Sequence, residues 1–310
     1  MKGPTPWQPL LRRALRRGLP DEPDTAFSCV ADSHSRFRDQ CALWVSTLLD
    51  HQGVSPERVF VHLVEPADQA FAEWLAALGI RVVSVAPFDD RSPHCNKLRQ
   101  LETAALAHTA EQIMLMDCDT VWLGDRPLPR VNRAAAKLVD NPTNPPRQVL
   151  ERLFAEAELG EPEWVEGDLA PIGEDGRFTD CNNCNGGVYL FARRTFRQFA
   201  EAWPRWARWC LDRRQLFGRS IHFDQVSYAL AARELRIRTE RLGVEWNYPA
   251  HLPSKRLPDL QPQIIHYHRR YTADLALLSM GLEQFDVTIM RFNSAMAGRV
   301  KAYRAAFPVE

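Results

Sequence analysis

The chain has 310 residues, 45% of them hydrophobic, which is enough for one large domain or for one domain with a small lid. Its 39 basic and 39 acidic residues balance, and this balance disfavours nucleic-acid binding, which would need a basic excess or a basic face. Seven scattered cysteines, an odd number, predict free thiols in a reducing compartment, so we expect a cytoplasmic protein.

Three segments divide the predicted chain. Residues 1–24 form a Pro-bounded basic extension, residues 25–275 the main domain, and residues 276–310 a C-terminal helix that packs back on that domain. In the extension, arginines lie beside leucines at helical spacing across Leu11–Leu19. A short surface helix packed on its own domain is the favoured interpretation, and peripheral contact with an anionic membrane face is the alternative. No apolar run approaches the length of a membrane span.

Strand and helix patterns alternate through the first half of the chain. Strands are expected at 26–31, 58–64, 80–85 and 113–116, and helices at 37–51, at 69–78 and around Lys97. This rhythm predicts an α/β fold with a mostly parallel central sheet covered by helices on both faces. The first strand is not followed by G-x-G-x-x-G and there is no P-loop, which disfavours a dinucleotide-dependent dehydrogenase and a P-loop kinase.

The second half is less regular. Strands are expected near 137, at 188–191 and at 263–267, with helices at 195–216, from 223 onward and near the C-terminus. The acidic segment 161–180 shows little periodicity and is expected to be a mobile loop over a site. Helical spacing favours a core position for Trp203, Trp206 and Trp209. The same spacing predicts one buried face on the C-terminal helix, made by Phe292, Met296, Val300 and Tyr303.

Two acids follow the apolar strand at 113–116. Asp117 and Asp119 stand at i and i+2 where the chain leaves the sheet, and ligands of open α/β sheets collect at the carboxyl ends of such strands. Both carboxylates can turn toward one point, and hard oxygen ligands suit Mg²⁺ or Mn²⁺ that also holds a diphosphate. The alternative is a pair of solvated turn acids.

The sequence NKLRQLE at 96–102, followed by IMLMDCDT at 113–120, resembles the nucleotide-sugar glycosyltransferases of the GT-A type. The likeness is closest to the glycogenin-like and lipopolysaccharide galactosyltransferase group, that is, to glycosyltransferase family 8. It implies a Rossmann-like nucleotide-diphospho-sugar transferase architecture for residues 25–275. It also implies a Mn²⁺-dependent (or Mg²⁺-dependent) enzyme that moves a sugar from a nucleoside-diphosphate sugar, with UDP-sugar favoured, to a glycan, lipid-linked or protein acceptor. Retention of configuration is favoured.

The resemblance also assigns roles to residues. It implies that Asp117, Asp119 and His266 bind the metal, with His268 as the alternative histidine. A larger set would bind the donor nucleotide, namely Ala31, Asp32, Ser33, Lys97, Arg99, Asp117, Gly186 and Gly187. The donor sugar would be bound by Asn185, Asp224 and Gln225.

The chain departs from the family after the late histidine. It reads HYHRRYT where the family has a glycine followed by Lys-Pro-Trp, so Arg269 or Arg270 would have to replace the lysine that contacts the diphosphate. A guanidinium is not equivalent to an ammonium in that role. Should the enzyme invert configuration, Asp180 or Glu174 in the acidic segment could supply a base.

Two other classes of protein stay open. One is a non-catalytic module that binds a nucleotide sugar on the same fold. The other is a thiol or zinc protein that uses Cys181 and Cys184, although no second cysteine pair stands at zinc-finger spacing. The sequence leaves open the donor sugar and base, the acceptor, the stereochemistry, the choice between His266 and His268, and the oligomeric state.

Overall fold

A computed structural model describes residues 24–309 with the exception of 219 and 221. Nearly all of the predicted basic extension, including the membrane contact at Leu11–Leu19, lies outside the described residues. None of the helices in the described part combines the length and the apolar composition that crossing a bilayer requires.

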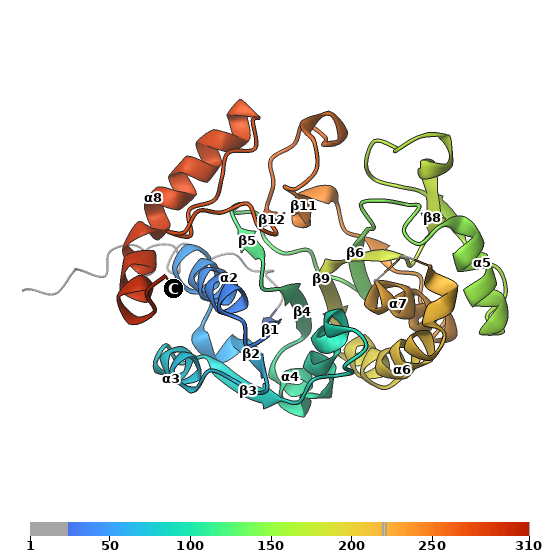
Figure 1. Ribbon diagram of the computed structural model, residues 1–310, viewed down its shortest axis with the longest axis horizontal. Helices are drawn as coiled ribbons and strands as arrows, with labels where there is room; N and C mark the ends of the chain where they lie inside the picture. The colour runs from blue at the N-terminus through green and yellow to red at the C-terminus, as the bar shows by residue number, and fades with distance from the viewer. Residues whose placement is uncertain (1–23, 219, 221, 310) are drawn as a thin grey trace, which may run out of the picture.

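A seven-stranded sheet, in the order β10-β6-β9-β4-β1-β2-β3, forms the centre of the molecule (Figure 1). Its strands are β1 (Thr25–Ala31), β2 (Val59–Val64), β3 (Arg81–Val85), β4 (Gln112–Asp117), β6 (Ala134–Leu138), β9 (Cys184–Ala192) and β10 (Glu240–Arg241). Strand β1 pairs in parallel with β2 and β4, β2 with β3, and β6 with β10, whereas β9 runs antiparallel to both β4 and β6. The predicted α/β fold with a mostly parallel sheet is confirmed.

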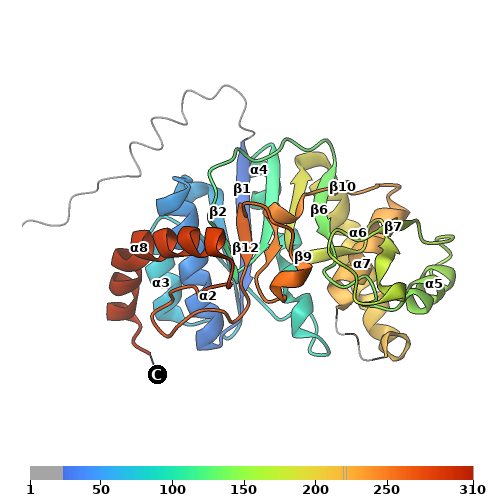
Figure 2. The same ribbon diagram turned by 90° about the horizontal axis from the view of Figure 1, so that it is seen from above.

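Helices cover both faces of this sheet (Figure 2). They are α2 (Ser35–Ser46), α3 (Gln69–Ala77), α4 (Ala104–Thr109), α5 (Arg147–Glu156), α6 (Arg193–Asp212), α7 (Phe223–Glu234) and α8 (Glu283–Ala306). Strand β4 shows why its sequence is apolar throughout. Ile113 and Leu115 enter the core beneath α6 and α7, while Met114 and Met116 enter the core beneath α2 and α3. A strand that is buried on both faces needs a continuous apolar run.

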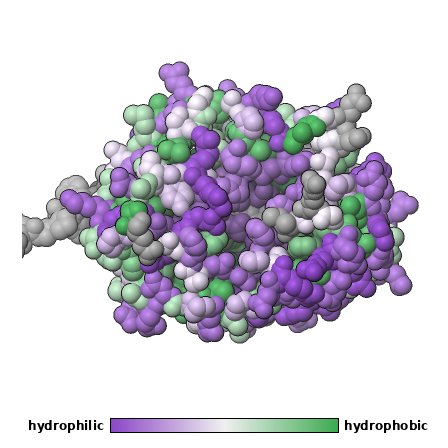
Figure 3. All heavy atoms as spheres, in the orientation of Figure 1, coloured by the Kyte–Doolittle hydropathy of each residue, from purple (hydrophilic) through white to green (hydrophobic). Residues whose placement is uncertain are grey.

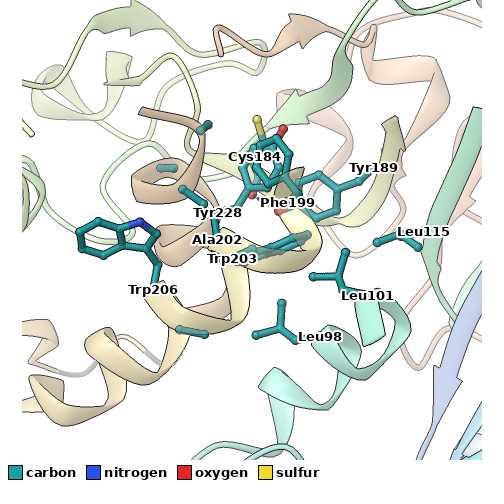
Figure 4. Packing of buried hydrophobic residues seen from close by; sticks show 14 of the residues in the cluster. Leu98, Leu101, Leu115, Cys184, Tyr189, Phe199, Ala202, Trp203, Trp206 and Tyr228 are labelled. Atoms are coloured by element: carbon teal, nitrogen blue, oxygen red, sulfur yellow. Dashed lines mark hydrogen bonds between the residues drawn. The ribbon is translucent and has the colours of Figure 1, made fainter. Parts of the chain in front are cut away.

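The aromatic core beneath α6 fixes the beginning of α7 (Figure 4). Tyr189 of β9 packs against Trp203 and Tyr228, with ring centroids 5.0 and 4.6 Å apart. The indole Nε1 of Trp203 donates to the backbone carbonyl of Asp224, 2.9 Å away. Trp203 and Trp206 are buried and Trp209 packs against the core, so the expectation that these tryptophans are structural is confirmed.

A second, three-stranded sheet lies beside the carboxyl end of β4. It contains β11 (Tyr248–Pro249), β12 (Ile264–His266) and β5 (Thr120–Trp122), in that order. Strands β12 and β5 are antiparallel, and His266 is in register with Thr120. The pairing brings the histidine at the end of β12 next to Asp119, which precedes β5.

Several predicted elements differ in detail from the structure. Segment 161–180 is not a structureless loop, because β7 (Trp164–Glu166) and β8 (Phe178–Asp180) form a two-stranded antiparallel sheet with the 3-10 helix η4 (Glu174–Arg177) between them. Lys97 lies in a 3-10 helix, η3 (Pro93–Glu102). The first predicted helix begins at Ser35 and ends as a π-helix, η1 (Thr47–His51). On α8, the expected inner face is observed.

Candidate functional site

A cavity of about 560 Å³ opens at the carboxyl ends of β1 and β4. Figure 3 shows a hollow near the centre of this face, surrounded largely by hydrophilic residues. The cavity takes side chains from segments that are far apart in the sequence, among them Asp32, Arg36, Lys97, Asp117, Asp119, Asp140, Asn185, Asp224, Gln225, His251, His266, His268 and Arg269. A ligand site at this edge of the sheet is what the fold class predicts.

Asp119, His266 and His268 form a compact cluster at the floor of the cavity. Nε2 of His266 lies 3.0 Å from one carboxylate oxygen of Asp119, and Nδ1 of His268 lies 3.3 Å from the other. The potential ligand atoms of the three residues all lie within 4.8 Å of one another. His268 reaches the cluster because its backbone is left-handed, with φ of 52°, and its ring stacks on that of His266 at 4.0 Å. Both histidines therefore belong to the cluster.

The electrostatics of this cluster suit a cation. Burial alone would raise the pKa of Asp119, but His266 and His268 outweigh it and hold that pKa well below its usual range. For His266 the effects have the opposite signs. Burial lowers its pKa, but Asp119 more than compensates, so the net shift of this pKa is upward. One carboxylate and two imidazoles are donors that Mn²⁺ accepts, with Mg²⁺ favouring oxygen more strongly. The residues present fit a divalent cation.

Asp117 is engaged differently from Asp119. Nζ of Lys97 lies 2.9 Å from Asp117 Oδ1 and 3.1 Å from Asp224 Oδ2, and it donates to the carbonyl of Gly186 at 3.2 Å. Burial would lower the pKa of Lys97, but the two carboxylates reverse the effect and raise it, so the ammonium stays charged. Oδ2 of Asp117 lies 3.9 Å from His266 Nε2, farther than the 3.0 Å between that nitrogen and Asp119.

Asn185 and the two glycines after it lie at the start of β9, beside β4. The amide oxygen of Asn185 accepts from Gly187 N at 2.9 Å, and its Nδ2 donates to Asp140 Oδ2 at 2.6 Å. A Cβ on Gly186 would collide with Lys97 Nζ, and one on Gly187 would collide with His266. Close packing of the site residues explains both glycines.

The first strand contributes one residue of the predicted trio. Asp32 lines the cavity, accepts a hydrogen bond of 2.9 Å from Asn96 Nδ2, and has its pKa raised by burial. Ala31 does not line the cavity, because its side chain is part of the core beneath α2 and α3. Ser33 is exposed and also does not line it.

Arg99 was expected at the diphosphate, and the structure places it elsewhere. Its guanidinium donates to the carbonyls of Ala86 and Pro87 and pairs with Glu102 at 2.6 Å. Residues 97 and 99 are two positions apart on one helix and therefore point to different sides of it, so Arg99 does not line the cavity with Lys97.

Of the two arginines proposed to replace the family's lysine, Arg269 lines the cavity. Arg270 donates to the carbonyl of Ser279 at 2.5 Å and lies outside the cavity lining. Asp224 is the second residue of α7, and its Oδ1 is buried without a hydrogen-bond partner. The side chain of Gln225 reaches His222 at 3.4 Å.

Sequence reasoning missed Asp140 and His251, two polar residues that line the cavity. Asp140 follows β6, and its Oδ1 pairs with the ammonium of Lys137, a side chain with no exposed surface. Burial would raise the pKa of Asp140, but Lys137 lowers it, so Asp140 carries a charge in the cavity. The available signal was the Asp-Asn-Pro sequence at 140–142, which follows the strand expected near 137. His251, whose ring stands 4.2 Å from that of His268, gave no signal.

Asp180 is not available as a base. It is buried outside the cavity lining, and its carboxylate accepts from the backbone N–H groups of Glu163 and Asn182 at 2.8 and 2.9 Å. Burial raises its pKa to about 6.

Among known proteins, solved structures with low sequence identity are similar to this chain. No family profile matches the sequence, and no curated protein matches it. The mouse xyloside xylosyltransferase 1 is 14% identical, with 79% of this chain and 98% of that chain covered and a TM-score of 0.45. The bifunctional glycosyltransferase WbbM is 12% identical, with 91% and 52% covered and a TM-score of 0.47. The galactosyltransferase LgtC, in complex with donor and acceptor sugar analogues, is 14% identical, with 86% and 95% covered and a TM-score of 0.46.

All three structures are named as glycosyltransferases, the class that the sequence resembles. This chain spans about half the length of WbbM. Because every TM-score is below 0.5, these likenesses carry no weight for the activity of this chain. The functional assignment rests on the fold and on the geometry of the cavity.

Proposed function

We propose that this chain is a metal-dependent glycosyltransferase of the GT-A type, which transfers a sugar from a nucleoside-diphosphate sugar to an acceptor hydroxyl. The observation that carries the proposal is the convergence of Asp119, His266 and His268 at the carboxyl end of β4, with the charged Lys97 close by. The cavity of about 560 Å³ has the size of a small-molecule site. UDP-sugar as donor, Mn²⁺ as metal, retention of configuration and a glycan, lipid-linked or protein acceptor belong to the same proposal.

Departure of the nucleoside diphosphate builds negative charge on its phosphate oxygens. A bound divalent cation neutralises such charge without a proton, and Asp119, His266 and His268 would hold it. Lys97 adds a fixed positive charge, since its ammonium is kept protonated by Asp117 and Asp224. Preorganised charge of this kind needs no rearrangement while the bond breaks.

The sugar itself would lie between α7 and the start of β9. The buried, unpartnered Oδ1 of Asp224 is an acceptor that a sugar hydroxyl can satisfy. Asn185 and Gln225 line the same part of the cavity and offer amide groups for further hydroxyls. Asp32, hydrogen-bonded to Asn96 at the end of β1, would face the nucleoside.

The thiol or zinc protein is the weaker candidate. Burial raises the pKa of Cys181 to about 12 and the pKa of Cys184 well above its usual value. A reactive or metal-binding cysteine needs the opposite shift, toward the thiolate. Among the described residues, the cluster that could hold a metal contains no cysteine.

Donor turnover tests the proposal and separates it from a non-catalytic binding module. The wild-type protein is incubated with a panel of nucleotide sugars, with Mn²⁺ or with EDTA, and release of nucleoside diphosphate is measured. We expect metal-dependent release for one donor, and a loss of about 100-fold or more in Asp119→Asn, which keeps the shape but removes the charge. Asp125→Asn, an exposed acid just beyond β5, is the control and should keep full activity. Metal-dependent binding without any release would favour the binding module.

A further inference from the structure

Two buried polar atoms without partners face each other across Gly187. They are Nδ1 of His266 and Oδ1 of Asn247, and the Asn247 side chain has no exposed surface. A Cβ built on Gly187 would lie 2.5 Å from the first atom and 2.8 Å from the second, so both atoms border the same small space. An unsatisfied buried polar atom costs about 1–3 kcal/mol, so two at one place call for a physical reason.

The tautomer of His266 supplies that reason. In the structure, Nε2 lies 3.0 Å from an oxygen of Asp119, where an Nε2–H would donate to the carboxylate. A neutral imidazole that binds a metal through Nε2 must carry its proton on Nδ1 instead. That Nδ1–H then needs an acceptor, and metal-bound histidines usually donate it to one.

We propose that Asn247 is the positioning residue that accepts the Nδ1–H of His266, and thereby presents Nε2 to the metal. The proposal rests on the metal site of the proposed function. Asn247 directly precedes β11, whose Pro249 is in register with His266 of β12, so the sheet itself holds the two side chains side by side. Gly187 leaves room for their contact, which a methyl group would block.

A directed chain of hydrogen bonds makes Asn247 an acceptor toward His266. The ammonium of Lys137 can only donate, and it donates to Asp140, which is therefore a charged carboxylate that can only accept. The Asn185 atom 2.6 Å from the other Asp140 oxygen must then be the donor Nδ2. The amide oxygen of Asn185 therefore faces Asn247, whose Nδ2 donates to it at 2.9 Å. With its nitrogen committed there, Asn247 turns its oxygen toward His266.

Calorimetric titration with Mn²⁺ alone tests this role without any measurement of turnover. Asn247→Leu keeps a similar volume but removes the acceptor, and we expect it to bind Mn²⁺ about 10- to 100-fold more weakly than wild type. Asn247→Asp restores an acceptor oxygen and should bind Mn²⁺ at least as tightly as wild type. It also provides a second readout if the leucine variant does not fold.

The matched control is Asn183→Ala. Asn183 is equally buried and also has an unpartnered Oδ1, but its Nδ2 donates to Thr179 Oγ1 at 2.9 Å and no contact joins its side chain to His266 among the described residues. We expect Asn183→Ala to lose stability and to keep its Mn²⁺ affinity. NMR of a histidine-labelled sample with Mg²⁺ adds a direct readout of the tautomer. The proton of His266 should lie on Nδ1 in wild type and in Asn247→Asp, whereas in Asn247→Leu no acceptor holds it there.

The outcomes separate this inference from the proposed function. Equal Mn²⁺ affinity of folded Asn247→Leu and wild type would overturn the role of Asn247 and leave the metal site standing. Weakening of both Asn247→Leu and Asn247→Asp would also overturn it, since the oxygen would then not be what matters. Failure of wild type to bind Mn²⁺ would overturn the metal site and this inference together.

Discussion

At the scale of single residues, charge decides which side chains serve the site. Lys97 lies within 3.1 Å of both Asp117 and Asp224, and none of the other described lysines and arginines forms an ion pair with either. Without its ammonium, two carboxylates would face an incoming diphosphate. The guanidinium of Arg99, two residues away, donates to two backbone carbonyls and forms an ion pair with Glu102. Proximity in sequence therefore does not give the two cations a common role.

Lys97→Met should weaken binding of UDP with Mn²⁺ by about 100-fold, because it removes one close, desolvated charge interaction of roughly 3 kcal/mol. Isothermal titration calorimetry measures the loss. Arg99→Met serves as the matched control and should stay within about twofold of wild type. Equal losses in both variants would show that the effect comes from damage to η3 rather than from the ammonium.

The sequence predicted some of these residues and not others. Asp117 and His266 end apolar strands, and Asp119 follows Asp117 at a recognisable spacing, so their place could be anticipated. The joint use of His266 and His268 could not, because it depends on the left-handed backbone at His268. Arg99 was expected beside Lys97 at the diphosphate, but residues two positions apart on a helix point to different sides, and its guanidinium bonds to two backbone carbonyls and Glu102. Asn247 and Asp140 stayed unseen because their importance depends on tertiary contacts.

At the scale of elements, strand β2 carries a histidine through the interior. The ring of His62 lies between β1 and the end of η3, 3.2 Å from Ser28 Oγ and 2.7 Å from Thr103 Oγ1. Its exposed fraction is 0%, and burial lowers its pKa from 6.5 to about 4. Between pH 6.5 and pH 4, His62 therefore binds a proton in the unfolded chain but stays neutral in the folded chain.

The sign of the effect follows directly. Stability from neutral His62 is complete above pH 6.5 and is lost as the pH falls toward 4, because protonation favours the unfolded chain. Between pH 7 and pH 5 the free energy of unfolding should fall by about 2 kcal/mol more in wild type than in His62→Gln. Urea denaturation at the two pH values measures this difference. Identical pH dependence in the two proteins would contradict the assignment.

The pairing of short strands is a second feature that the sequence did not predict. The alternation of strands and helices predicted a parallel sheet, and each of β1, β2, β3 and β4 was anticipated. The small sheet of β11, β12 and β5 was not, although it joins His266 to Asp119 across 147 positions. A strand was expected at 263–267, where β12 lies, but its pairing with β11 and β5 was not, because strands of two or three residues leave no periodic signal that identifies their partners.

At the scale of the whole molecule, two cores on opposite faces of one sheet support the cavity at the carboxyl edge of that sheet. Residues of β4 enter both cores, and the aromatic core beneath α6 fixes the beginning of α7 and so the position of Asp224. The cluster of Asp119, His266 and His268 thus belongs to one connected framework with Lys97 and Asp224. A ligand that binds this framework stabilises the folded state against the unfolded state by mass action.

The most direct test of the central claim is a thermal-shift panel of wild type with UDP, GDP and CDP and their sugars, each with Mn²⁺ and with EDTA. We predict that one nucleotide, UDP in the first place, raises the melting temperature with Mn²⁺ and not with EDTA. Asp119→Asn should abolish that shift. No shift with any of these ligands, or an equal shift in EDTA, would contradict a metal-dependent nucleotide-sugar site.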